Sequence, residues 1–337
     1  MSITGLIAGN LIIRRKLPFG KSDLVDEAGY PLSWGWWEQP IQVEPIGSGR
    51  EASWIGTAFD YVAMAMLERK VGSEHTLRDT WAAEGALYII CADIGGLIGE
   101  HAVLRPASNP FDATSERGKG YDLALKYHTE VRKILERYWD TAVSTHKKFL
   151  SDKASVADYA ESALFLASLD AYRQATSPTV LDWAFKDMNI VGQPKGKLFF
   201  NQNVAVDNLG NAVSDIVQQC QLFERWLEVN TIDRVVLHPT YGGEVDFIYD
   251  KTLVDLKTTK KLEWSADYWA QVRRYAAVAL DSGQPIERIA IYYARFGATA
   301  VLEITPERKD QLAEWLKLIQ IEALRCRHRD QTEALRE

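Results

Sequence analysis

The spacing of apolar residues along the chain changes near its middle. From about residue 51 to 190, apolar side chains recur every three or four positions, which is the period of an amphipathic helix. A stretch rich in Pro, Ser and Gly at 106–120 interrupts this pattern and is typical of a long exposed loop. The pattern predicts five helices, at 53–69, 76–100, 121–150, 154–175 and 179–188. We therefore predict a mainly helical region at 1–200.

Short runs of β-branched and aromatic residues replace this period after residue 195. Two further helices are predicted, at 265–280 and at 306–327, where Pro306 suits a first turn because its missing N–H costs nothing there. The order of elements from residue 211 onward is α-β-β-β-α-β-β-α. The predicted strands lie at 198–206, 234–238, 244–249, 253–257, 289–294 and 300–304. We predict a mixed sheet flanked by helices at 201–337, in an α+β or α/β fold.

The composition is that of a folded chain with no global attraction to polyanions. Of 337 residues, 47% are hydrophobic and 25% are charged, which is enough apolar material for one large or two moderate cores. The net charge is −7, so nucleic acid must be met by a local basic patch. The most apolar segment, 85–99, contains Asp93 and four glycines and is shorter than the ~20 residues that span a bilayer. We predict no membrane span.

Cysteine usage and the amino terminus both indicate a reducing compartment. The three cysteines, Cys91, Cys220 and Cys326, are far apart and form no C-x-x-C pair. This spacing speaks against a disulfide framework, a zinc knuckle and a sequence-local iron–sulfur cluster. Residues 1–21 place their charges after the apolar stretch, whereas a secretory signal places them before it. A cytoplasmic protein is predicted.

Residues 241–261, YGGEVDFIYDKTLVDLKTTKK, hold the most informative pattern in the chain. A strand bearing Asp246 leads through a tight turn into a second strand that carries Asp255, Leu256 and Lys257. Because successive side chains of a strand alternate between faces, Asp255 and Lys257 point one way and Leu256 points the other. Hairpin pairing then brings Asp246 beside them.

Two carboxylates and an ammonium on one face of a sheet are costly unless they serve one another or a cation. Mg²⁺ prefers oxygen ligands, usually one or two carboxylates with waters and phosphate oxygens. Asp246, Asp255 and the Leu256 carbonyl supply such ligands. Lys257 would orient or help deprotonate an attacking water and stabilise the charge that develops on a phosphate. The alternative is an ordinary hairpin whose charges are solvated on an outer face.

This order of motifs, G-x-V-D, a turn, V-D-L-K-T-T and a helix with Q-x-x-x-Y, resembles the PD-(D/E)XK nuclease superfamily in its RecB-like exonuclease branch. The matching region covers about 238–280. The resemblance implies a restriction-endonuclease-like mixed sheet core, two aspartates that bind Mg²⁺ and a lysine that activates water. It also implies that a Gln and a Tyr contact the substrate strand. The residues at these positions are Asp246, Asp255, Lys257, Gln271 and Tyr275.

The resemblance further implies a third metal ligand, for which three residues compete. The segment 55–67, IGTAFDYVAMAML, resembles the family's G-x-x-x-H helix with Asp60 in place of His, and Asp is a competent Mg²⁺ ligand. Residues 51–69 would then contribute to the active site. Asp60 is also typical of a solvated first-turn residue, and Glu224 and Glu228 are rival ligands. The four cysteines that hold an iron–sulfur cluster in some branch members have no equivalent, so no cluster is expected.

Substrate contacts are predicted from residues around the same helix. Gln271 and Tyr275 are four positions apart and share a helix face. Trp264 and Tyr268 are candidate stacking platforms for bases, although Tyr268 and Tyr275 also fit a core stripe. The basic residues that could track a phosphate backbone, or form a solvated helix face, are Lys260, Lys261, Arg273, Arg274 and Arg295.

We expect a DNA nuclease that depends on Mg²⁺ or Mn²⁺, an exonuclease that hydrolyses phosphodiester bonds in bacterial or phage recombination, repair or defence. Its partners would be DNA and a protein such as a helicase or another recombination or defence component. The alternative is a catalytically inactive nuclease-fold subunit that binds DNA or assembles with a protein partner. The sequence is compatible with DNA or RNA, with single or double strands, and with cutting at ends or internally.

Overall fold

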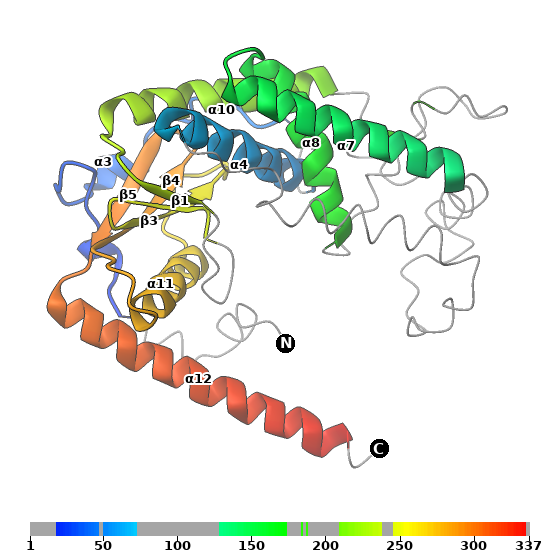
Figure 1. Ribbon diagram of the computed structural model, residues 1–337. Coiled ribbons are helices and arrows are strands. Elements are labelled where there is room, and N and C mark those ends of the chain that lie inside the picture. Colours follow the sequence, from blue (N-terminus) through cyan, green and yellow to red (C-terminus); the bar gives the residue numbers. More distant parts are fainter. Residues whose placement is uncertain are drawn as a thin grey trace. The chain divides into compact units, whose positions relative to one another are not determined.

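A computed structural model describes residues 18–46, 50–72, 128–173, 183–184, 187, 209–237 and 245–334 (Figure 1). Within these residues it is an α+β structure with seven α-helices and one mixed sheet of five strands. The chain divides into two compact units, Met1–Gln42 with Asn230–Glu337, and Val43–Val229. We call them the sheet unit and the helical unit. No helix in the described ranges is long and apolar enough to cross a membrane.

The helical unit contains four long helices that pack against one another. They are α4 (Arg50–Val71), α7 (His128–Leu150), α8 (Val156–Arg173) and α10 (Leu209–Val229). Three of the predicted helices are thereby confirmed, with ends that differ by a few residues. The predicted helix at 76–100, the loop at 106–120, the strand at 198–206 and most of the helix at 179–188 lie outside the described residues.

The helix α4 lies at the centre of the helical unit because it is apolar nearly all round. Its side chains from Ala58 to Leu67 are almost all buried, and it contacts α7, α8 and α10. Trp54 near its start donates from Nε1 to the Leu164 carbonyl and to Ser168 Oγ on α8, at 2.8 and 2.9 Å. A helix with apolar residues on every side is expected at the centre of a bundle.

The sheet unit contains one mixed sheet in the order β1-β2-β3-β4-β5. Neighbouring strands pair antiparallel except β3 and β4, which are parallel and are joined by the crossover helix α11 (Ala266–Asp281). The strands predicted from residue 234 onward are confirmed. Their bounds are β1 (Val235–Leu237), β2 (Phe247–Tyr249), β3 (Thr252–Lys257), β4 (Arg288–Tyr293) and β5 (Ala298–Glu303).

The strands β2 and β3 are joined by a two-residue turn that fixes their register. Asp250 and Lys251 have φ of 40° and 68°, and a type I′ hairpin turn requires such left-handed values at both central positions. Phe247 consequently pairs with Val254. Because a slip by one residue would move every side chain of β3 to the other face, this turn determines the side on which Asp255 lies.

Two helices complete the core of the sheet unit. The helix α11 packs on β3 and β4, and α12 (Pro306–Ala334) lies against α11 (Figure 1). Trp269 of α11 and Trp315 of α12 are buried in one apolar cluster with Ile289 of β4. The helix α12 extends to Ala334, beyond its predicted end at residue 327, and Ile319 is the last buried residue among its side chains described up to Arg325.

Residues 18–42, which we call the amino-terminal strap, belong to the sheet unit. They contain the 3₁₀ helix η1 (Lys21–Asp23) and the short helix α3 (Trp34–Trp37). Val25 pairs with Val301 of β5 through two backbone hydrogen bonds of 2.9 and 2.8 Å. Gln42 Nε2 donates to the Phe296 carbonyl at 2.8 Å. The strap therefore belongs with the sheet and α10 belongs with the helices α4 and α8 that it contacts, so the two units do not meet at residue 200.

Candidate active site

The β2–β3 hairpin brings Asp246 to the strand that carries the other predicted site residues. Asp246 immediately precedes β2, and its Oδ2 accepts a hydrogen bond from the Leu256 backbone N–H at 2.6 Å. This bond holds the Asp246 carboxylate beside β3, next to the residue that follows Asp255. The N–H and C=O groups of one strand residue point to the same side of the strand, so the Leu256 carbonyl faces the side on which Asp246 lies.

Asp255 and Lys257 form an ion pair on one face of β3. Lys257 Nζ lies 2.6 Å from Asp255 Oδ2, and the two side chains are 18% and 5% exposed. Apart from this ion pair, Asp255 Oδ2 is buried without a hydrogen-bond partner among the described residues. The burial of Asp255 contradicts the alternative of a hairpin whose charges are solvated.

The hairpin carries oxygen atoms of the kind that a hard divalent cation prefers. The Lys257 ammonium already offsets part of the cost of burying the Asp255 charge, and a metal ion beside Asp255 would offset more of it. Mg²⁺ requires only one or two carboxylates, with carbonyl groups and waters completing its shell. In the part of the chain that the structure describes, no group of three or more His, Cys, Asp or Glu side chains could hold a metal ion. The hairpin itself offers two carboxylates, those of Asp246 and Asp255.

The helix α11 places the predicted glutamine and tyrosine on one face. Gln271 Nε2 donates to the Tyr275 hydroxyl at 2.8 Å, as the i and i+4 spacing predicts. Burial raises the pKa of Tyr275, the hydrogen bond from Gln271 opposes this increase, and the Asp255 carboxylate adds to it. Gln271 and Tyr275 therefore contact each other, and Tyr275 lies within electrostatic reach of Asp255.

The two predicted stacking rings both have partners within the protein. Tyr268 is in the first turn of α11, and its ring centroid lies 5.1 Å from Lys257 Nζ. Trp264 stacks on Trp269 of the core, with ring centroids 5.6 Å apart. The face of Tyr268 that meets Lys257 is consequently occupied by an ammonium.

The structure contradicts the predicted phosphate contacts of three arginines. Arg273 and Arg295 are fully buried, and Arg274 is 5% exposed. A guanidinium with so little exposed surface cannot reach a nucleic-acid strand, so the prediction is wrong for all three residues. Lys260 and Lys261 are exposed in the loop after β3 and stay candidates for phosphate contacts.

Aromatic rings surround the buried Arg273. Its guanidinium carbon lies 5.5, 5.3 and 5.8 Å from the ring centroids of Phe19, Trp264 and Trp269. None of its three side-chain nitrogens has a hydrogen-bond partner among the described residues. Burial lowers the pKa of Arg273 to about 10, and Asp23 opposes this decrease. Phe19 and Asp23 belong to the strap, so this buried charge connects α11 with the strap.

Two residues near the site have structural roles that were not predicted. Arg295 is fully buried after β4 and donates from Nε to the Thr258 carbonyl at 3.0 Å, which fixes the chain directly after Lys257. Tyr293 pairs in register with Lys257 across the parallel ladder, and burial raises its pKa. The signal in the sequence was that Arg295 and two tyrosines lie within the apolar run IAIYYARFG.

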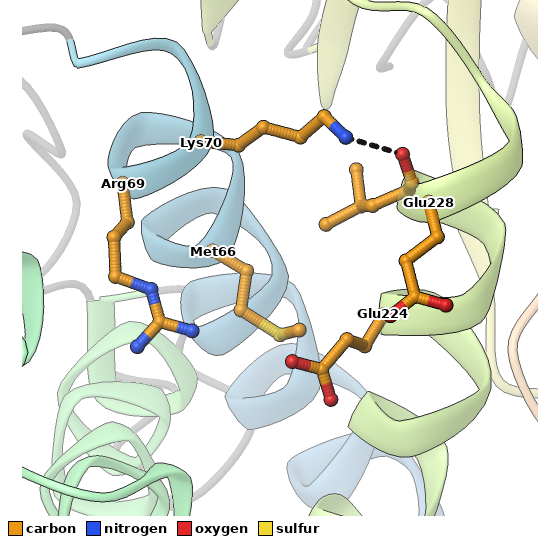
Figure 2. Close-up of a pocket in the computed structure, with 6 residues that line it drawn as sticks. Met66, Arg69, Lys70, Glu224 and Glu228 are labelled. Carbon is orange, nitrogen blue, oxygen red and sulfur yellow. Dashed lines mark hydrogen bonds between the residues drawn. The ribbon is translucent and has the colours of Figure 1, made fainter.

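The candidate third ligands lie in the helical unit. Asp60 is partly buried on α4. Glu224 and Glu228 of α10 line a cavity of about 250 Å³, whose other lining residues are Met66, Arg69, Lys70 and Leu227 (Figure 2). Lys70 points from α4 toward α10 and donates to the Leu227 carbonyl (Figure 2). The two glutamates thus share their cavity with two cations, and metal binding by any of the three candidates stays a prediction.

No protein-family model, no curated protein and no solved structure matches the chain. The hairpin and α11 are therefore the features on which a function can be proposed.

Proposed function

We propose that the chain is a Mg²⁺-dependent DNA nuclease with a restriction-endonuclease-like core, related to the RecB-like branch of the PD-(D/E)XK superfamily. The observation that carries the proposal is the buried Asp255–Lys257 ion pair beside Asp246, on the middle strand of the sheet. The proposed reaction is hydrolysis of a phosphodiester bond, by an exonuclease of bacterial or phage recombination, repair or defence.

The cost of burying these charges supports a function for them. Removing one partner of a buried ion pair costs about 3–5 kcal/mol, whereas replacing both partners with apolar residues is often neutral or stabilising. Stability alone therefore gives no reason for Asp255 and Lys257 in a strand whose neighbours Val254 and Leu256 are buried and apolar. A functional role would explain why the strand keeps both charges.

Each polar group of the hairpin has a role in this proposal. Asp246, Asp255 and the Leu256 carbonyl would hold a metal ion, which supplies a Lewis acid for the phosphate and a bound water of lowered pKa. Lys257 orients the attacking water and stabilises the negative charge on the phosphoryl oxygens. That charge develops while the water oxygen bonds to phosphorus and the bond from phosphorus to the leaving oxygen breaks.

The proposed substrate contacts lie next to the hairpin in sequence. Gln271 is partly exposed and presents its amide to a strand near the scissile phosphate, whereas Tyr275 is 4% exposed and holds that amide through its hydroxyl. Lys260 and Lys261 are exposed directly after β3 and provide the local positive charge that a chain of net charge −7 needs to meet a polyanion. Strand separation would come from a protein partner such as a helicase, because the chain has no P-loop motif.

Cleavage of end-labelled nucleic acid tests the proposal. Wild-type protein and Asp255→Asn are incubated with single-stranded, double-stranded and closed circular DNA and with RNA, in Mg²⁺, Mn²⁺ or EDTA. We expect metal-dependent release of labelled product by the wild type and a loss of at least about 100-fold in Asp255→Asn. Asp281→Asn changes an exposed aspartate at the end of α11, and this matched control should keep full activity.

The possible outcomes test the proposed site and the proposed substrate class separately. Equal activity of wild type and Asp255→Asn, with equal melting curves, would contradict the proposed site. DNA binding without cleavage in either metal would favour the inactive nuclease-fold subunit. Resistance of the closed circle would identify a requirement for ends, and cleavage of RNA alone would change the substrate.

A further inference from the structure

Two contacts locate the ammonium of Lys257. Asp255 Oδ2 lies 2.6 Å from Nζ, and the ring centroid of Tyr268 lies 5.1 Å from it. The carboxylate comes from the same strand as the lysine, whereas the ring comes from the first turn of α11. The carboxylate and the ring therefore reach one ammonium from two different elements.

A lysine needs such contacts if its charge is to stay in one place. The ammonium is carried on a flexible four-carbon stem and has three rotatable donors, so one carboxylate alone restrains it weakly. The face of an aromatic ring attracts an ammonium within about 6 Å, and the attraction increases when water is excluded. The Lys257 side chain is 18% exposed, so its contact with Tyr268 is largely shielded from solvent.

The position of the Tyr268 ring is fixed by the start of α11. Ser265 caps the helix, and its Oγ accepts the Tyr268 backbone N–H at 3.4 Å. Tyr268 is half-buried and packs against the apolar cluster that contains Trp269. The ring is consequently part of the packed protein and is in place before any substrate binds.

We propose that Tyr268 is a positioning residue whose ring keeps the Lys257 ammonium beside Asp255, and that it is not a platform on which a base stacks. The catalytic consequence of this role rests on the proposed nuclease function, whereas the contact with Lys257 does not. A stacking ring acts on substrate affinity. A positioning ring acts on the location of the Lys257 ammonium, so the two roles give different results when the ring is removed.

Chemical modification of Lys257 tests the positioning without any need for nuclease activity. Full-length wild type, Tyr268→Phe and Tyr268→Leu are acetylated with limiting acetic anhydride from about pH 7 to pH 10, and each lysine is quantified by mass spectrometry. Lys257 of Tyr268→Leu should react about two- to fivefold faster, the effect of losing a cation–π contact at a partly exposed site. Tyr268→Phe keeps the ring and should react as the wild type does. Lys260 and Lys261 are exposed in the adjoining loop and serve as internal references.

Single-turnover cleavage distinguishes positioning from stacking. Tyr268→Leu should lower the cleavage rate at saturating DNA and shift its pH profile, with the DNA concentration for half-maximal rate unchanged. Loss of a stacking platform would instead raise that concentration and leave the acetylation of Lys257 as in the wild type. Tyr30→Leu removes an exposed tyrosine of the strap and controls for general effects.

Equal acetylation of Lys257 in wild type and Tyr268→Leu would overturn the positioning role. If circular dichroism shows that Tyr268→Leu does not fold, Tyr268→Met removes the ring with an unbranched side chain, and the same comparison applies. Faster acetylation in the variant, without cleavage by any of the proteins, would support the role of Tyr268 in placing Lys257 and refute the proposed nuclease function.

Discussion

Replacing Arg273 with Met removes a buried positive charge and leaves an unbranched side chain of similar length in its place. Burial lowers the pKa of Arg273 well below its usual range, to about 10. At ~1.4 kcal/mol for each pKa unit, keeping the charged form costs the folded chain about 3 kcal/mol at neutral pH. The three surrounding rings lie near the outer distance limit for a cation–π contact. Each ring stabilises the charged guanidinium by about 0.5 kcal/mol. The net cost of the charge is therefore about 1–2 kcal/mol.

The cost of keeping Arg273 charged in the folded chain depends on pH. Arg273 would lose its proton near pH 10 in the folded chain, whereas in the unfolded chain it stays protonated to a higher pH. The cost is therefore fully present below pH 10 and decreases as the pH rises above it. At pH 7 we expect Arg273→Met to raise the free energy of unfolding of the sheet unit by about 1–2 kcal/mol.

Hydrogen exchange of α11 peptides in increasing urea measures this free energy for the sheet unit, which is necessary because the chain has two compact units. Arg273→Ala also removes the charge but leaves a cavity, so it should be less stable than Arg273→Met. Arg325→Met changes an exposed arginine of α12 and should alter the free energy by less than about 0.5 kcal/mol. A decrease of more than about 1 kcal/mol in Arg273→Met would refute the reasoning, because the guanidinium would then be net stabilising.

Lys257→Ala should lower the cleavage rate about 100-fold and leave Mg²⁺ affinity nearly unchanged, as measured by single-turnover kinetics and calorimetry. Arg295→Met should lower stability by about 1–3 kcal/mol and increase hydrogen exchange in the loop after β3, because the Thr258 carbonyl loses its donor. Burial, together with Asp187, raises the pKa of Tyr138 to about 12, so the folded chain keeps this proton while the unfolded chain ionises from about pH 10. The helical unit should therefore lose stability between about pH 10 and 12, and Tyr138→Phe should reduce that loss in a circular-dichroism titration.

Specific results would contradict these expectations. Lost Mg²⁺ binding with unchanged single-turnover chemistry in Lys257→Ala would assign Lys257 to metal binding and remove its role toward the water. Unchanged exchange in Arg295→Met would show that the Thr258 carbonyl finds another donor. Identical alkaline titrations of wild type and Tyr138→Phe would exclude Tyr138 as a source of the loss.

Local patterns in the sequence were sufficient to predict the elements that carry the candidate site. The sequence predicts the strand at 253–257, and β3 lies at Thr252–Lys257, because the apolar run and the alternation of Asp255 and Lys257 are both local features. It predicts the following helix from residue 265, and α11 begins one residue later because Ser265 is its cap. Such features depend on residues that are neighbours in the chain.

Long-range contacts account for what the sequence did not predict. The strap has no helical or strand period, and its place depends on the hydrogen bonds between Val25 and Val301 in β5. The charge pattern of α11 does not show which face meets the core, so Arg273 was assigned to a phosphate. Trp269 lies four positions before Arg273 and Ala276 lies three positions after it, so all three share one buried face of α11. These two apolar neighbours were the signal that Arg273 points into the core.

The sheet unit is assembled from two stretches of chain that are synthesised at different times. Asp23 of the strap and Arg308 of α12, which form an ion pair, are 285 residues apart in sequence, and the whole helical unit is encoded between them. A ribosome adds about 5–20 residues per second, so roughly 15 to 60 seconds pass between the synthesis of Asp23 and that of Arg308. The helical unit is continuous in sequence and is complete before β5 has been made. During synthesis, Trp36 and Trp37 of the strap therefore have no apolar cluster of the sheet unit to pack against until the later strands and helices have been made.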